Sequence, residues 1–159
     1  MNEAHIHLII NHFPIIIPII AILARLSAFA LKSESLKRFA LILLVIGAIT
    51  SFAAMQSGEK AEEIIENLSF FSETHLEAHE EAAETFAIFS YVIGAFAAIA
   101  LWAEFTKKKF ALYITEITFA LCIVSLFFAQ KTGNTGGEIR HEEIRKGFEV
   151  PQGAEEEKE

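Results

Sequence analysis

Four long apolar runs alternate with polar segments along the chain, and each run is long enough to cross a bilayer as a helix. A bilayer core of roughly 30 Å needs about 20 helical residues. The runs predict membrane-spanning helices at about residues 8–31, 37–55, 83–103 and 109–130. The sequence therefore predicts an all-α, integral membrane four-helix bundle in one domain of residues 1–150, followed by a disordered acidic tail at 151–159.

The polar segment between the second and third runs has a helical pattern of its own. Ala61, Ile64, Ile65 and Leu68 recur at helical spacing, with glutamates between them. This pattern predicts an amphipathic outer helix at about residues 58–68 that lies at the membrane surface or caps the bundle. Glycine disfavours a helix interior, so we expect breaks after the second and fourth spans, at Gly58, Gly133, Gly136 and Gly137.

Composition supports this interpretation and narrows the possible functions. Apolar residues make up 53% of the 159 residues, the mean hydropathy is +0.40 and the net charge is −8. An acidic chain repels phosphates, so we expect no nucleic-acid partner. Cys122 is the single cysteine, which excludes an intrachain disulfide, an iron–sulfur cluster held within this chain and haem attached through Cys-x-x-Cys-His.

Basic residues in the short loops predict the orientation. Lys32, Lys37 and Arg38 follow the first span, and three lysines at 107–109 follow the third. Basic loops favour the cytoplasmic side, so we expect both termini outside, in a bacterial inner membrane. The basic residues after the fourth span, from Lys131 onward, count against this orientation.

Two opposite charges interrupt the apolar runs. Arg25 lies seven residues before Lys32, and Glu116 lies seven residues after Lys109, so both are about 10 Å inside the cytoplasmic boundary. A charge in the membrane normally finds a partner. We expect a structural ion pair between Arg25 and Glu116, and an ion or proton path through Glu116 is the alternative.

The six histidines all lie on the predicted outer side, which suggests a cofactor. A b-type haem needs two imidazoles on facing helices and an apolar slot. His12 and His79 are the first candidates for axial ligands because each is closest to its apolar run, and the remaining histidines are His5, His7, His75 and His141. The sequence thus predicts haem b in an electron-transfer subunit, which would connect quinone with a redox partner protein.

Two alternatives remain open from the residues. A transition metal could be held by the set His12, His79, His141, Glu62, Glu63 and Glu80, because such metals accept imidazole and carboxylate together. The histidines could instead be interfacial groups in a cofactor-free accessory or structural protein. No nucleophile–base pair or phosphate-binding glycine loop is present, so nothing indicates an enzyme, and a homo-oligomer remains open.

A faint internal repeat runs through the chain. The second span is followed by Ser57-Gly58-Glu59, the fourth by Gly136-Gly137-Glu138, and the first and third spans are each preceded by histidines. A duplicated two-helix hairpin would produce this pattern, although the match is short enough for chance to explain it.

Four short motifs in order resemble a family of bacterial membrane proteins that carry the domain of unknown function 2231. They are Ala4-His5-Ile6-His7 through Asn11-His12-Phe13-Pro14, then Gly58-Glu59-Lys60-Ala61-Glu62-Glu63, His79-Glu80-Glu81-Ala82, and Thr132 through His141. The resemblance implies a four-helix membrane fold, and some relatives are linked to redox modules. Asn134 stands where relatives often carry a histidine, which weakens a ligand role for that segment.

Overall fold

The fold is all-α, as the sequence predicts. The computed structural model describes residues 2–65 and 72–149, and within them it contains no strand. The helices are α1 (Glu3–Ile10), α2 (Phe13–Leu31), α3 (Glu34–Ile65), α4 (Glu73–Phe105), α5 (Ala111–Arg140) and the short 3-10 helix η1 (Glu142–Ile144). Residues 66–68 of the predicted outer helix and the acidic tail lie outside the described residues.

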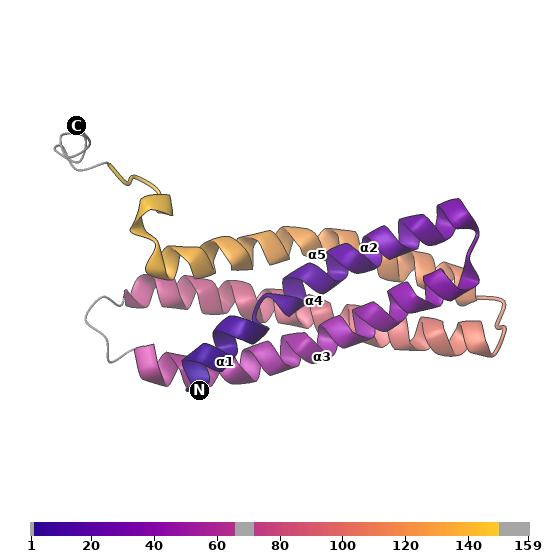
Figure 1. Cartoon of the computed structure of the whole chain (residues 1–159), viewed down its shortest axis with the longest axis horizontal. Coiled ribbons are helices and arrows are strands. Elements are labelled where there is room, and N and C mark those ends of the chain that lie inside the picture. Colours follow the sequence, from indigo (N-terminus) through magenta and orange to yellow (C-terminus); the bar gives the residue numbers. More distant parts are fainter. Residues whose placement is uncertain (1, 66–71, 150–159) are drawn as a thin grey trace.

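The long helices form an elongated bundle of two hairpins. Helices α2 and α3 form the first hairpin, α4 and α5 form the second, and both turns lie at the same end of the bundle (Figure 1). Helix α2 packs against α3 and α5, and α4 packs against α3 and α5, while the short α1 lies along α3. The two hairpins therefore run in the same direction and sit side by side.

Small residues let the helices approach closely at the core. Leu41, Ile93, Phe119 and Cys122 are buried there among several alanines. A Cβ atom added to Gly94 of α4 would overlap the Cβ of Ala48 on α3. Close packing of small residues is the usual basis of helix association in lipid, where no hydrophobic force drives helices together.

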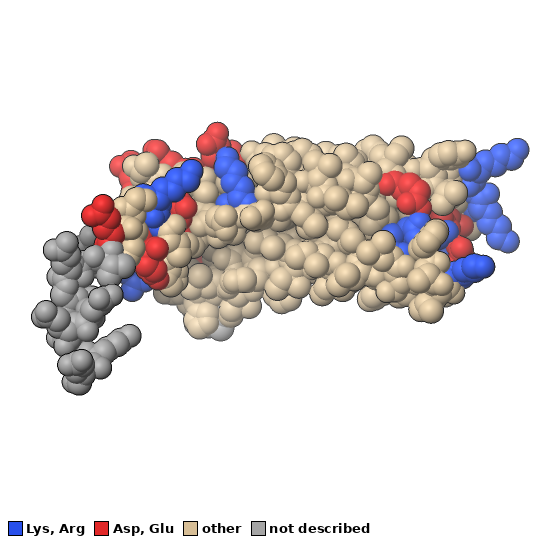
Figure 2. All heavy atoms as spheres, turned by 90° about the horizontal axis from the view of Figure 1, so that it is seen from above, with Lys and Arg blue, Asp and Glu red and all other residues tan. Residues whose placement is uncertain are grey.

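The outside of the bundle is apolar along its middle. Large apolar side chains such as Phe29 (77% exposed), Ile49 (62%) and Phe127 (69%) face outward. Figure 2 shows the acidic and basic residues gathered toward the two ends of one face, with a band of other residues between them. All four helical segments are long and apolar enough to cross a membrane. The four-span prediction is confirmed, and the apolar surface contacts lipid.

The first crossing is divided into two helices. Asn2 caps α1, with its side chain accepting from the His5 backbone N–H at 3.0 Å, and α1 ends at Ile10. After the turn at Asn11 and His12, α2 begins with Pro14 in its first turn. Proline has no N–H to donate and fits the first helical turn, so it starts a new helix rather than continuing α1.

The predicted breaks at the glycines are wrong. Gly58 lies inside α3, which runs without interruption to Ile65, and Gly133, Gly136 and Gly137 lie inside α5. The segment predicted as an outer helix is thus the end of α3 as far as it is described. At Gly58 and Gly136 a neighbouring imidazole lies where a side chain would be, which accounts for glycine inside the helix at these two positions.

Candidate functional site

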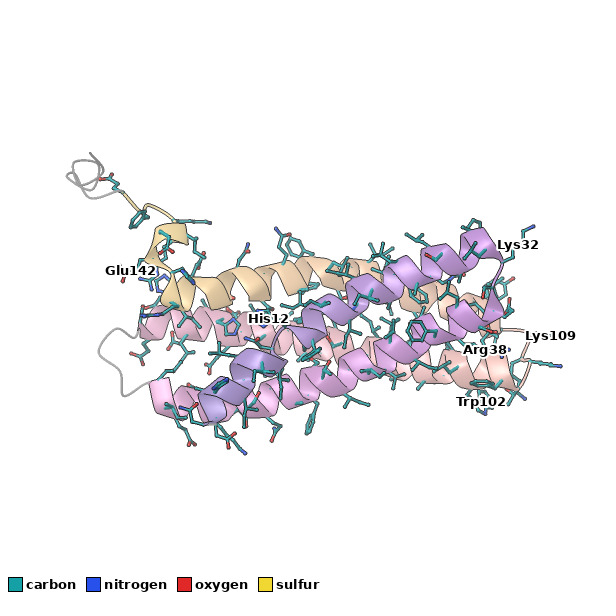
Figure 3. The ribbon with its side chains drawn as sticks, viewed as in Figure 1. His12, Lys32, Arg38, Trp102, Lys109 and Glu142 are labelled. Atoms are coloured by element: carbon teal, nitrogen blue, oxygen red, sulfur yellow. The ribbon has the colours of Figure 1, made fainter. Side chains whose placement is uncertain are left out.

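The two ends of the bundle carry different chemistry. We call the end formed by residues 2–12, 54–65, 73–84 and 131–148 the histidine end, and the end formed by residues 25–38 and 102–116 the lysine end. Figure 3 shows Lys32, Arg38, Trp102 and Lys109 together at the lysine end and Glu142 at the opposite one. All six histidines belong to the histidine end or to its border with the apolar middle.

His7 joins α1 to α3 through three contacts. Its Nδ1 lies 3.1 Å from the backbone oxygen of Ala54 and 3.1 Å from the hydroxyl of Ser57. A Cβ added to Gly58 would lie 3.2 Å from the ring carbon Cε1 of His7. Because Gly58 has no side chain, the imidazole can lie directly against the helix. We call the space that such a glycine leaves for a ring a glycine seat. We call this arrangement the His7 clamp.

His79 joins α4 to α5 in the same way. Its Nδ1 lies 3.2 Å from the backbone oxygen of Thr132 and 3.3 Å from the hydroxyl of Thr135. A Cβ added to Gly136 would lie only 2.9 Å from the Cε1 of His79. We call this the His79 clamp, and it is the tighter of the two.

The two clamps are equivalent position by position. In each, the carbonyl belongs to residue i of the receiving helix, the hydroxyl to residue i+3 and the glycine to residue i+4. The structure thus pairs Gly58 with Gly136 in the internal repeat. Matching contacts on two hairpins that run in the same direction are what a duplicated hairpin would give.

Each clamp fixes the tautomer of its imidazole. A backbone carbonyl can only accept, so Nδ1 of His7 and of His79 donates, and the lone pair of each neutral ring is on Nε2. A histidine that donates one ring nitrogen to a carbonyl is oriented as metal-ligating histidines usually are. A positive charge on the His7 ring would disfavour one on the His79 ring. His7 lies on α1, which packs along α3 of the first hairpin, and His79 lies on α4 of the second, so the two clamps belong to different halves of the molecule.

The other histidines make local contacts. His12 lies at the junction of α1 and α2 (Figure 3), and its exposed ring bonds at 3.2 Å to the backbone oxygen of Leu8 in the preceding α1. His75 contacts the hydroxyl of Ser72, and His141 pairs with Glu143. The His5 side chain is exposed. Only His7 and His79 therefore combine partial burial with contacts to a second long helix.

The histidine–carboxylate set that the sequence suggested for a metal is not assembled. Among residues 2–65 and 72–149, no group of three or more His, Cys, Asp or Glu side chains is placed to hold a metal ion. The His12 ring bonds to Leu8 of the preceding α1 and His141 lies beyond the end of α5, so the six side chains do not converge. Two imidazoles are a sufficient ligand set only where a cofactor supplies the remaining ligands, as haem does.

A carboxyl pair also crosses between the hairpins at this end. Glu80 follows His79 on the polar first turns of α4, ahead of the apolar part of that helix, and it shares a hydrogen bond with Glu62 of α3. This bond, burial, and the negative charges of Glu62, Glu84 and Glu77 raise the pKa of Glu80 to about 7. The link between the two carboxyl groups therefore depends on a proton.

A positively charged cavity lies beside the His79 clamp. It has a volume of about 400 Å³, and the described residues that line it include Lys131, Arg145 and Lys146, with Glu138 the only acid among them. Thr135, whose hydroxyl contacts His79, lines the cavity too. An acidic protein thus presents a local excess of positive charge next to one of its clamped imidazoles.

Ion pairs join the hairpins at the lysine end. The Arg25 guanidinium of α2 pairs with the Glu116 carboxylate of α5. Lys37 of α3 lies 2.8 Å from Glu104 of α4 and 2.7 Å from Glu34. The sequence does not predict the Lys37–Glu104 pair, because both residues lie in or near predicted loops. Their positions at the beginning of one span and the end of the next are the available signal.

Comparison with known proteins gives one result. The family model described as predicted membrane protein, domain of unknown function 2231, matches residues 3–143. No curated protein and no solved structure matches the chain. The matched segment includes all four crossings and both clamps, and it covers most of the sequence. The chain therefore belongs to the family of predicted membrane proteins with the domain of unknown function 2231.

Proposed function

We propose that this membrane protein is a b-type haem-binding electron carrier whose axial ligands are His7 and His79. The observation that carries the proposal is the pair of equivalent clamps, each with Nδ1 donating to a carbonyl. The clamps orient two imidazoles from different halves of the molecule and leave Nε2 of each as the nitrogen that can ligate. A bound haem would supply a one-electron carrier.

The residues at this end suit haem in donor type and in charge. Two neutral imidazoles are a complete axial ligand set for a b-type haem. The glycine seats at Gly58 and Gly136 hold each ring against a rigid helix, which limits its rotation. The cations that line the cavity beside His79 suit the two carboxylates of a haem.

His7 replaces His12 as the preferred partner of His79 in this proposal. The ring of His12 is exposed and bonds within its own turn, whereas the ring of His7 is partly buried and interacts electrostatically with that of His79. His12 lies two residues beyond the end of α1, so it is the natural runner-up. Absorption spectra of alanine variants separate the two residues.

The setting we propose is a bacterial inner membrane with the histidine end outside. The lysine end would then face the cytoplasm, as basic loops do. In this orientation the carrier would exchange electrons between quinone in the membrane and a redox partner protein on the outer side. The exposed glutamates of α4, Glu73, Glu77 and Glu81, would favour a partner with a basic surface.

An absorption spectrum tests the cofactor directly. Protein purified in detergent and titrated with haemin should develop a saturable Soret band, and dithionite should sharpen the α and β bands as expected for bis-histidine ligation. His7→Ala and His79→Ala should each abolish the low-spin reduced spectrum. His12→Ala, the matched control, should keep it. Loss in His12→Ala but not in His7→Ala would instead assign His12.

A cofactor-free role is the competing interpretation, and one observation favours it. Each imidazole already joins two helices by hydrogen bonds, so the clamps could serve stability alone. Under this interpretation haemin would give no saturable Soret band, and His7→Ala and His79→Ala would lower the melting temperature without any spectral change. That result would reject the haem proposal.

A further inference from the structure

The lysine end has many more cations than its carboxylates can neutralise. Its three carboxylates, Glu34, Glu104 and Glu116, are all in ion pairs with Arg25 or Lys37. Among the described contacts, five further cations of this end make no ion pair with a carboxylate: Lys32, Arg38, Lys107, Lys108 and Lys109. The end therefore has a net positive charge at the boundary of the apolar band.

Arg38 is held in place by an aromatic ring, and its Nε lacks an acceptor. Its guanidinium carbon lies 5.0 Å from the centre of the Phe105 ring of α4. The Nε atom is buried and, within the described part of the chain, has no hydrogen-bond partner. A buried donor without an acceptor is costly, and a planar guanidinium is the group best suited to bind a phosphate. The Arg38 guanidinium is thus held beside an aromatic ring, with hydrogen-bonding capacity that no carboxylate of the described chain uses.

The neighbouring loop extends this positive surface along the membrane boundary. The Lys108 ammonium lies 5.3 Å from the Trp102 ring, which packs near Phe110 at 6.4 Å between ring centres. Trp102 is 53% exposed on the outside of the bundle. Exposed tryptophans are enriched at the headgroup level of a bilayer. The cations thus lie at the level where lipid phosphates lie.

Two lysines of this end have backbone conformations that glycine usually adopts. Lys32 and Lys107 have φ angles of 50° and 52°, a conformation that favours glycine. Lys32 is the residue that terminates α2, where glycine is the usual choice. A lysine at both positions places a cation where the backbone alone would favour a residue without a side chain.

We propose that the lysine end binds the headgroup of an anionic phospholipid, with Arg38 and the 107–109 loop as its principal contacts. The phosphate of the lipid would accept from the Arg38 guanidinium, while Trp102 and Phe105 would contact the upper acyl chain. A lipid is the occupant because the cations border an apolar surface that faces the bilayer. This proposal does not depend on haem at the opposite end.

Thermal unfolding in mixed micelles tests the proposal. Phosphatidylglycerol added to the full-length detergent-purified protein should raise the melting temperature saturably, and phosphatidylcholine with the same acyl chains should not. Each cation lost should weaken binding roughly fivefold, so Arg38→Gln/Lys109→Gln should raise the half-saturating phosphatidylglycerol concentration about 25-fold. Arg38→Lys keeps the positive charge, so it should weaken phosphatidylglycerol binding less than Arg38→Gln does. Lys60→Gln, at the histidine end, should match the wild type.

Three results would overturn the proposal. Equal responses to the two lipids would show that headgroup charge is not recognised. An equal shift with inorganic phosphate alone would assign a free-anion site rather than a lipid site. If Arg38→Gln does not fold, the wild-type protein still decides the question. Its half-saturating phosphatidylglycerol concentration should rise from low to high salt, and no salt dependence would contradict the proposal.

Discussion

The two ends of this bundle are joined by different chemistry and in different directions. At the histidine end, hydrogen bonds from imidazoles tie helices within each half of the molecule, α1 to α3 and α4 to α5. At the lysine end, ion pairs tie one hairpin to the other, α2 to α5 and α3 to α4. The ion pairs of the lysine end therefore add to the core packing between the hairpins, whereas the imidazoles of the histidine end join helices within each half.

This difference suggests how a cofactor could enter without disrupting the fold. An ion pair that neutralises itself has little capacity left for a ligand, whereas a neutral imidazole keeps a free lone pair. The boundary between the hairpins at the histidine end is crossed by the Glu62–Glu80 pair, which depends on a shared proton. A planar group inserted between His7 and His79 would separate the hairpins only at this end, because the ion pairs of the lysine end still join them.

The largest effect should come from breaking one hairpin-joining ion pair. The Arg25 side chain is only 15% exposed, so Glu116→Gln leaves a mostly buried cation without its partner. We expect a loss of about 3 kcal/mol in the free energy of unfolding. Arg25→Gln/Glu116→Gln removes both charges and should lose less. The measurement is denaturant unfolding in detergent micelles. An equal loss of unfolding free energy in the two variants would show that the ion pair does not stabilise the fold.

A smaller effect should come from filling the glycine seats of the clamps. Gly136→Ala brings a methyl group to 2.9 Å from His79, so the ring must move away from its carbonyl and hydroxyl partners. We expect a loss of about 1–2 kcal/mol in the free energy of unfolding. In Gly58→Ala the added methyl group would lie 3.2 Å from His7, so the free energy of unfolding should fall by less. Thermal melts of the two variants would rank the clamps.

Gly133 provides the matched control for this ranking. It lies on the same helix as Gly136, and an added Cβ would be 3.8 Å from the nearest atom, an ordinary contact with Ile15. Gly133→Ala should therefore stabilise α5 by up to about 1 kcal/mol through helix propensity. A loss in Gly133→Ala equal to that in Gly136→Ala would mean that α5 needs glycine for a reason unrelated to the clamp.

Much of the fold can be predicted from the sequence because lipid imposes simple rules. Every backbone group must be satisfied within the membrane, so a long apolar run becomes a helix. Equal distances from flanking lysines place Arg25 and Glu116 at one depth, and the structure has their side chains in contact. Both arguments need only position along the chain, which a sequence contains.

The candidate site is harder to predict because its contacts join distant residues. Glycine by its local preference predicts a helix break, but Gly58 and Gly136 are inside helices because an imidazole from another helix fills their space. Nearness to the apolar run favours His12 over His7 in the sequence. That criterion ignores the break at Asn11, which lets α1 lie along α3 and brings His7 to Ala54 and Ser57.

The smallest effect should be on the pH dependence of stability, through the one inter-hairpin link that needs a proton. The pKa of Glu80 is raised to about 7 from its ordinary value of 4.5, chiefly by its hydrogen bond with Glu62. A raised pKa in the folded state stabilises fully below 4.5, and this contribution is lost as the pH rises through about 7. Since both groups are partly solvated, the loss should be at most about 1 kcal/mol.

Glu80→Gln should flatten this dependence, because the amide can still donate to Glu62 but does not titrate in this range. Melting temperatures measured from mildly acidic to mildly alkaline pH should fall in the wild type and change less in Glu80→Gln. Glu59→Gln, an exposed acid on α3, should keep the wild-type slope. If the wild type and Glu80→Gln share one slope, then the proton between Glu62 and Glu80 does not hold the hairpins together at the histidine end, and other contacts must close that boundary.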